Sequence, residues 1–283
     1  MNETDWDQLL WAIEEERCTP FLGAGSCIPT LPSGLALARE WATTHAYPLA
    51  DDDDLARVSE YLAIEQVPMA PKHAIRRMFL DATPPSFEGD EPHAVMARLP
   101  IPVYLTTNYV DYMAEALRQA YRNPRVDFCR WTTTPAVKNH PSQLPKTFVP
   151  SATEPVVYHL HGHIDVPQSF VLTETDYIAF LVEISRRRLL PHQIEKALAN
   201  GSLIFIGYGF RDWDFRVIFR GLVAAQEAVR ELGVTVQLDT DDEPSRRYLE
   251  KYFNELDLRV YWGDARAFVS ELGRRWKEHK GGD

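Results

Sequence analysis

Six short apolar runs punctuate the chain, and longer segments with helical spacing of apolar residues separate them. A short continuous apolar run is typical of a strand that is buried on both faces of a sheet. The runs predict strands at residues 19–22, 102–106, 155–159, 203–207, 234–238 and 258–262. Because strands that alternate with helices form parallel sheets, the pattern predicts an α/β fold. We expect a Rossmann-like, doubly wound parallel sheet of about six strands.

The segments between these strands predict helices. Trp6, Leu9 and Ile13 fall on one helical face, which predicts a first helix that ends near residue 16. Further helices are expected at residues 110–121, 176–199, 212–230, 244–255 and 264–277.

Two regions interrupt the alternation. Residues 34–97 show helical patterns and no convincing strand, so we expect a small helical insertion lobe within a single domain over residues 1–283. Residues 122–154 are rich in Pro, Thr and Asn, and we expect an irregular excursion there.

The overall charge and composition exclude several function classes. The net charge is −11, whereas broad binding of nucleic acid or of an anionic membrane needs a basic face, so we expect neither partner. No apolar run approaches membrane-spanning length, and the acidic N-terminus does not match a secretory signal. The three cysteines, Cys18, Cys27 and Cys129, have neither metal-binding spacing nor an even number for a disulfide framework. We expect a cytoplasmic protein with buried thiols.

The first predicted strand ends in the glycine-rich turn Gly23-Ala24-Gly25-Ser26. Glycine lets the backbone approach a ligand closely, and a helix that begins here would point its free N–H groups at an anion. The turn is consistent with a phosphate-bearing nucleotide or with a plain strand-to-helix connection. A hydride-transfer dinucleotide site needs a third glycine where this chain has Ile28, so that class is disfavoured.

Polar or small residues also follow the later strands, where parallel sheets bind their ligands. Asn108, after Thr107 at the end of the second strand, can hold a ribose or a water, or it can cap the next helix, as can Asp111. Gly207, before Tyr208, allows close approach of a nucleotide. Asp264, after the last strand, either lies near an adenine or caps a helix.

Three alternating histidines begin at the last residue of the third strand: His159, His161 and His163. Strand alternation would place all three on one side, but no carboxylate or cysteine pattern accompanies them, so we expect no metal site. His159 is expected to be a satisfied histidine inside the sheet. His161 is the preferred general base, because Gly162 beside it leaves room for a ligand.

With these segments in order, the chain resembles the sirtuin superfamily, and it is most similar to the bacterial sirtuin-like NAD-hydrolase domains of anti-phage defence systems. The resemblance spans about residues 21–265. It rests on the motifs Phe-Leu-Gly-Ala-Gly-Ser (21–26), Leu-Pro-Ser-Gly (31–34), Leu-Thr-Thr-Asn-Tyr (105–109), His-Leu-His-Gly (159–162), Val-Leu-Thr-Glu-Thr-Asp-Tyr (171–177) and Ile-Gly-Tyr-Gly-Phe-Arg-Asp-Trp-Asp (206–214).

The resemblance implies NAD as the substrate and assigns roles by position. Residues 23–26 match the loop that wraps the pyrophosphate, Asn108 matches the asparagine that positions water and the nicotinamide ribose, and His161 matches the catalytic base. The expected NAD-contacting set is Gly23, Ala24, Gly25, Ser26, Thr107, Asp111, Gly207, Tyr208 and Asp264.

Two departures from the family pattern matter. The family often has Asp two residues after the asparagine, but this chain has Val110 there and Asp111 one position later. The protein deacylases carry a four-cysteine zinc module, but residues 163–206 contain no cysteine, so we expect no structural zinc.

We therefore expect an NAD+ glycohydrolase that releases nicotinamide and ADP-ribose and acts as an anti-phage, abortive-infection effector. The alternatives are an NAD-dependent deacylase or ADP-ribosyltransferase, and a non-catalytic NAD-sensing module. Because the catalytic fold uses almost the whole chain, we expect control by homo-oligomerisation or by a sensor or activator protein.

Overall fold

A computed structural model describes residues 1–186, 189–199, 201–209, 232–240 and 242–281. Its strands form one parallel seven-stranded sheet in the order β3-β4-β2-β1-β5-β6-β7. The doubly wound fold class is confirmed, with seven strands where about six were expected. The strands are β1 (Cys18–Leu22), β2 (Val103–Thr106), β3 (Arg125–Phe128), β4 (Val156–His159), β5 (Ser202–Ile206), β6 (Gly233–Gln237) and β7 (Leu258–Trp262).

The additional strand, β3, lies in the region expected to be irregular. It pairs only with β4, at the edge of the sheet. Its Asp127 is 2% exposed, and its carboxylate accepts hydrogen bonds from Arg130 at 2.8 Å and Ser142 at 2.6 Å. A buried carboxylate in a four-residue strand breaks the apolar pattern that marks the other strands.

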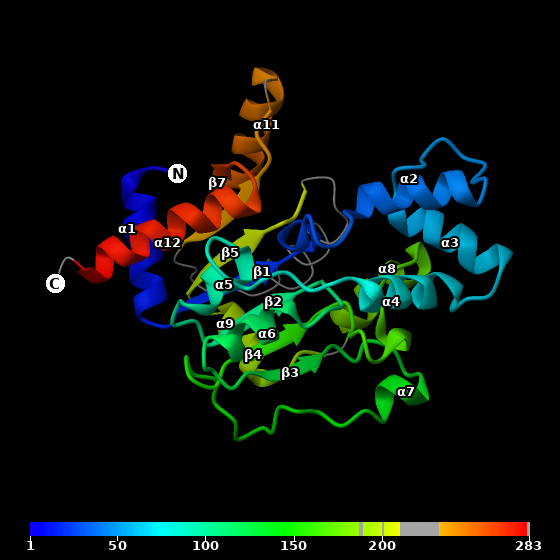
Figure 1. Ribbon diagram of the computed structural model, residues 1–283, viewed down its shortest axis with the longest axis horizontal. Coiled ribbons are helices and arrows are strands. Elements are labelled where there is room, and N and C mark those ends of the chain that lie inside the picture. The colour runs from blue at the N-terminus through cyan, green and yellow to red at the C-terminus, as the bar shows by residue number, and fades with distance from the viewer. Residues whose placement is uncertain (187–188, 200, 210–231, 241, 282–283) are drawn as a thin grey trace.

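Helices flank the sheet, and side chains on its two faces pack into two hydrophobic clusters. Ile204 and Ile206 belong to one cluster, whereas Leu203 and Phe205 belong to the other, as expected for a strand that is buried on both faces. Figure 1 shows α2, α3, α4 and α8 gathered at one end of the molecule, with α1 and α12 at the other.

The helices have the following bounds: α1 (Glu3–Glu14), η1 (Ala24–Cys27), α2 (Gly34–Thr44), α3 (Leu55–Glu65), α4 (Ala70–Asp81), α5 (Pro92–Ala97), α6 (Tyr112–Gln119), α7 (Pro135–Lys138), η2 (Pro167–Ser169), α8 (Glu174–Arg186), α9 (His192–Ala199), α11 (Glu243–Asn254) and α12 (Ala265–Gly281). The helix expected at residues 212–230 lies outside the described residues. Within the described part of the chain, no helix combines the length and apolar character needed to cross a bilayer.

The helices between β1 and β2 are tied to the loop that follows β4. Lys72 on α4 is 7% exposed, and its ammonium donates to the Phe170 carbonyl at 2.9 Å and to the Asp176 carboxylate at 2.8 Å. Arg76, one turn later, donates to the Ile164 carbonyl at 3.0 Å. Side chains of the insertion therefore satisfy backbone carbonyls of the sheet domain.

A buried Glu91–His93 pair fixes the start of α5. The Glu91 carboxylate accepts from the Ala94 N–H and lies 2.7 Å from Nδ1 of His93. Burial alone would lower the pKa of His93, but hydrogen bonds to Cys27 and Glu91 outweigh burial and raise the pKa to about 9. Cys18 and Cys129 are buried like Cys27, which confirms the expectation of buried thiols.

This pair predicts pH-dependent stability. The pKa of His93 in the folded protein lies above the ordinary value of about 6.5. The stabilisation that comes from protonated His93 is therefore fully present below about pH 6.5, and it is lost as the pH rises through about 9. Replacing the ring leaves Glu91 buried without its charged partner. We expect His93→Gln to lower the free energy of unfolding by about 3–5 kcal/mol at pH 6, and by less above pH 9.

Urea unfolding of the wild type and of His93→Gln, at pH 6 and above pH 9, measures how the loss of unfolding free energy depends on pH. Glu88→Gln removes an exposed carboxylate three residues before Glu91 and should change the unfolding free energy by less than about 0.5 kcal/mol. An equal loss for His93→Gln at both pH values would contradict the charged pair.

Candidate functional site

The carboxyl ends of the central strands lie level with one another. Leu22 at the end of β1 is in register with both Thr106 of β2 and Ile206 of β5, and Thr106 is in register with His159 of β4. The residues that follow these strands therefore meet at one edge of the sheet. The strands that follow β1 extend the sheet on one side of it up to β4, and those from β5 onward extend it on the other side. Doubly wound sheets leave a crevice for ligands at such a switch point, which here lies between β1 and β5.

The turn after β1 packs directly against the turn after β5. The Gly25 N–H donates to the Gly207 carbonyl at 2.9 Å, and Gly207 has a φ of +78°. A Cβ on Gly207 would lie 2.4 Å from the backbone nitrogen of Ser26, so a larger residue does not fit. Contact between the two turns is therefore sufficient to explain these glycines.

The segment after Gly23 is η1, a four-residue 3₁₀ turn, and α2 begins only at Gly34. The expected α-helix start with free N–H groups is thus absent at residues 24–27, because the chain turns too tightly there. The turn at residues 24–27 therefore presents no α-helix N-terminus to a phosphate.

Asn108 is anchored to this glycine turn. Its Nδ2 donates to the Gly23 carbonyl at 3.0 Å and lies 3.3 Å from the Ser26 hydroxyl, which itself donates to the Gly23 carbonyl at 2.7 Å. The backbone carbonyl of Asn108 lies 2.7 Å from Nδ1 of His159. Among the described residues, none donates to Oδ1 of Asn108, an atom that can accept a hydrogen bond from a water or a ribose hydroxyl.

The structure brings most of the expected NAD-contacting residues to this edge. The Thr107 hydroxyl donates to the Tyr208 hydroxyl at 3.3 Å, and both residues are buried. Together with Asn108, the residues assembled here are Gly23, Ala24, Gly25, Ser26, Thr107, Gly207 and Tyr208.

Asp264 lies apart from this group. It follows β7, three strands from β1, which corresponds to about 14 Å at the usual strand spacing. Its carboxylate accepts from the Ala267 N–H at 2.7 Å at the start of α12. Of its two expected roles, helix capping is the one that the structure displays.

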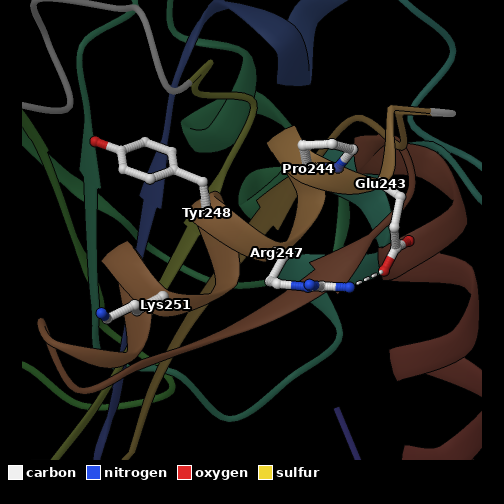
Figure 2. A pocket seen from close by; sticks show the side chains of 5 residues that line it. All are labelled: Glu243, Pro244, Arg247, Tyr248 and Lys251. Atoms are coloured by element: carbon white, nitrogen blue, oxygen red, sulfur yellow. Dashed lines mark ion pairs between the residues drawn. The ribbon is translucent and has the colours of Figure 1, made fainter.

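A hollow of about 350 Å³ lies on α11, away from the expected residues. Figure 2 shows its lining residues along this helix, with an ion pair of 3.5 Å between Arg247 and Glu243. The lining consists of Glu243, Pro244, Arg247, Tyr248 and Lys251. Since none of these residues belongs to the group at the sheet edge, the hollow is not a candidate for the NAD site.

His161 does not lie with the other two histidines. β4 ends at His159, so strand alternation does not continue. The ring of His161 packs edge-on against Tyr177 and Phe180 of α8, with centroid distances of 5.5 and 5.1 Å. His161 is 1% exposed, and burial lowers its pKa to about 3, which keeps the imidazole neutral.

The space beside Gly162 is filled by protein. Gly162 has a φ of +99°, and a Cβ there would lie 2.3 Å from the Ser169 carbonyl oxygen. The expectation that this glycine leaves room for a ligand is therefore wrong: the glycine allows two backbone segments to cross.

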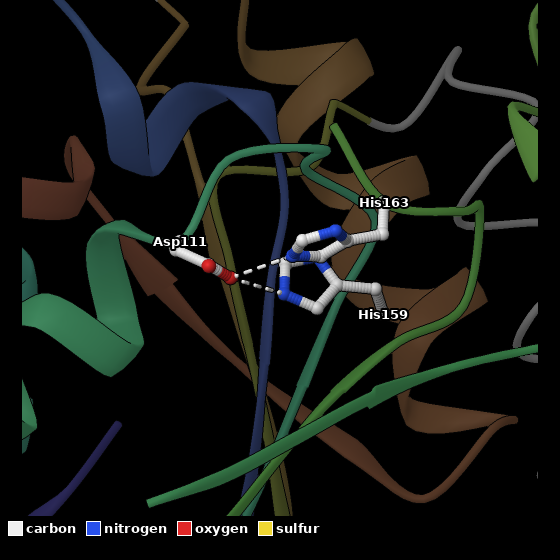
Figure 3. Close-up of side chains that lie close together, drawn as sticks. All are labelled: Asp111, His159 and His163. Carbon is white, nitrogen blue, oxygen red and sulfur yellow. Dashed lines mark hydrogen bonds and ion pairs between the residues drawn. The ribbon is translucent and has the colours of Figure 1, made fainter. Parts of the chain in front are cut away.

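His159 and His163 converge on Asp111, as Figure 3 shows. Their Nε2 atoms lie 3.2 and 3.0 Å from Oδ1 of Asp111. Burial alone would raise the pKa of Asp111, but its interactions with the two histidines hold that pKa well below the usual range. The same carboxylate raises the pKa of His163 against the effect of burial. Sequence reasoning missed this cluster because its carboxylate comes from the turn after β2.

The SIR2-like domain model matches residues 102–257, which is more than half of the 283-residue chain. The chain belongs to the SIR2-like family. This membership confirms the sirtuin-like resemblance, and it is consistent with the parallel, doubly wound sheet. The matched range contains Asn108, the histidine segment and Gly207, but begins after the glycine turn of β1.

Curated relatives of this SIR2-like chain carry the name NAD(+) hydrolase ThsA. The protein from Enterococcus faecium is 28% identical over 202 residues, which cover 71% of this chain and 39% of that protein. The protein from Acinetobacter baumannii is 24% identical over 288 aligned positions, which cover 96% of this chain and 56% of that protein. The protein from Bacillus cereus is 26% identical over 218 residues, which cover 76% of this chain and 42% of that protein. The SIR2-like chain thus spans about 39–56% of the length of these relatives.

The contact between the two turns predicts a difference between two glycine substitutions. Gly89 also has a positive φ, +61°, but a Cβ there meets nothing within 4 Å. We expect Gly89→Ala to lower the unfolding free energy by about 1–2 kcal/mol, because this substitution introduces backbone strain and no steric overlap. Gly207→Ala adds overpacking against Ser26, and we expect about 1–3 kcal/mol more.

Denaturant unfolding of the two variants isolates the steric contribution. Equal losses would show that the turns can separate freely at the β1–β5 boundary.

Proposed function

We propose that this chain is an NAD+ glycohydrolase that releases nicotinamide and ADP-ribose. The relatives named NAD(+) hydrolase support the reaction class. The observation that carries the proposal is the anchoring of Asn108 to the glycine turn at the switch point, with its amide oxygen available. We further propose that residues 1–283 form one catalytic domain with a helical insertion lobe over residues 34–97.

In the proposed reaction the bond between C1′ of the ribose and the nicotinamide nitrogen breaks, and the electron pair leaves with nicotinamide. Water adds to C1′ of the oxocarbenium-like sugar and loses a proton to His161. Oδ1 of Asn108 accepts a hydrogen bond from this water and so holds it in attacking geometry. A neutral imidazole can accept the proton, and such base catalysis accelerates reactions by about 10²–10⁴-fold.

Substrate access requires a rearrangement around His161. Tyr177 and Phe180 of α8 pack against the ring, so a shift of α8 would uncover it for NAD. An enzyme that destroys a common cofactor must be restrained, and this cover offers a physical basis for restraint. We propose that self-association or a sensor or activator protein opens the site, and that the resulting NAD depletion serves anti-phage defence.

The mechanism predicts the effect of two substitutions. Asn108→Ala and His161→Ala should each lower nicotinamide release from NAD by about 10²–10⁴-fold, because each removes a group that acts on the attacking water. Product analysis by chromatography measures the rate, across a range of protein concentrations and with candidate activator proteins. Asn139→Ala and His73→Ala are matched controls at exposed positions and should retain the wild-type rate.

Full activity in both site variants would contradict the assigned mechanism. Tight NAD binding without turnover in every assembly state would indicate a sensing module. NAD turnover that depends on an acetylated peptide would indicate a deacylase.

A further inference from the structure

Three side-chain atoms of metal-binding type converge where β2 and β4 end (Figure 3): Oδ1 of Asp111 and Nε2 of His159 and of His163. The two nitrogens lie 3.2 and 3.0 Å from the oxygen, and all three atoms lie within 4.8 Å of one another. Ligand atoms held tetrahedrally about 2.0–2.1 Å from Zn²⁺ are about 3.3 Å apart. The two nitrogen–oxygen separations are thus close to those of a zinc ligand set.

The tautomer of His159 provides an independent observation. Its ring is fully buried, and its Nδ1 lies 2.7 Å from the Asn108 carbonyl oxygen, which can only accept a hydrogen bond. Nδ1 must therefore carry the hydrogen, which leaves a lone pair on Nε2 of the neutral ring. Nε2 is aimed at Asp111, yet it has no partner in hydrogen-bond geometry.

A lone pair on Nε2 would face a carboxylate oxygen at 3.2 Å, and this arrangement becomes favourable when a proton or a metal cation lies between the two atoms. We propose that Asp111, His159 and His163 bind one divalent transition-metal cation of the Zn²⁺ class. This site goes beyond the proposed NAD hydrolysis, and it uses none of the cysteines of the chain.

The surroundings of His159 fit this role. Metal-binding histidines usually donate their other ring N–H to a carbonyl or a carboxylate. His159 does so to Asn108, and His163 has the Asp165 carboxylate 3.7 Å from its Nδ1. The Asp165 backbone N–H donates to this Nδ1 at 3.3 Å, so in the structure Nε2 of the neutral ring carries the hydrogen and faces Asp111 at 3.0 Å. Metal binding through Nε2 therefore requires His163 to change tautomer and direct Nδ1–H toward the Asp165 carboxylate.

The ligand set favours one class of cation. Two imidazoles and one carboxylate suit Zn²⁺ and neighbouring transition metals, whereas Ca²⁺ and Mg²⁺ prefer oxygen ligands. The Asp111 side chain is 26% exposed, which leaves a path for the cation and for a water ligand. A bound cation joins the turn after β2 to the loop after β4, and it fixes the backbone of Asn108 through His159.

The test uses the full chain, freed of any affinity tag and stripped with a chelator. Titration calorimetry with Zn²⁺, and metal analysis after gel filtration, should give one zinc ion per chain. A hundredfold excess of free Zn²⁺ over Kd should raise the Tm by roughly 4–5 °C, whereas Mg²⁺ should leave the Tm unchanged. Asp111→Asn and His163→Gln should each weaken binding by at least about 10–100-fold.

His73→Gln removes an exposed histidine outside the cluster and should bind zinc like the wild type. Far-ultraviolet circular dichroism identifies the variants that fold. If a variant does not fold, zinc binding by the wild type still tests the proposal. Absence of zinc binding by the folded wild type would overturn the proposal and favour a doubly protonated His159. Equal zinc affinity of the wild type and Asp111→Asn would overturn it as well.

Discussion

The candidate site depends on how closely two turns approach each other across the β1–β5 boundary. The Gly23 carbonyl accepts hydrogen bonds from the backbone and hydroxyl of Ser26 and from the amide of Asn108. That carbonyl is held in place because Gly25 bonds to Gly207, and only glycine permits this separation. The position of Asn108 is therefore set by a contact between backbones, which explains how β2 and β5 contribute to one site.

The sequence predicts the central sheet well and its contacts poorly, for physical reasons. Strands buried on both faces must be apolar throughout, so β1, β2 and β5 stand out as short apolar runs. β3 does not stand out, because it contains Asp127, whose buried carboxylate is stabilised by Arg130 and Ser142 from outside the strand.

The same distinction holds at the site. Asn108 and Gly207 are predictable because they follow strands in a parallel sheet. The meeting of Asp111 with His163 is not, since it depends on how two loops fold back over the sheet edge. The filling of the space at Gly162 by Ser169 is equally invisible to local patterns, because it is a crossing of two chain segments.

The burial of His161 links access to basicity. His161 is 1% exposed, and this burial favours the neutral imidazole. Movement of α8 would admit substrate and would also rehydrate the ring, which returns its basicity toward that of an ordinary histidine. If His161 is the base, as we propose, one displacement of α8 controls both substrate access and the basicity of the ring.

The bonds from Lys72 and Arg76 to the carbonyls of Phe170 and Ile164 have a consequence for local unfolding. If α4 detached, these carbonyls would lose their donors, and the Lys72 ammonium would lose its partner Asp176. Detachment of α4 is therefore coupled to the loop after β4, and the amide hydrogens of these two segments should exchange with solvent together.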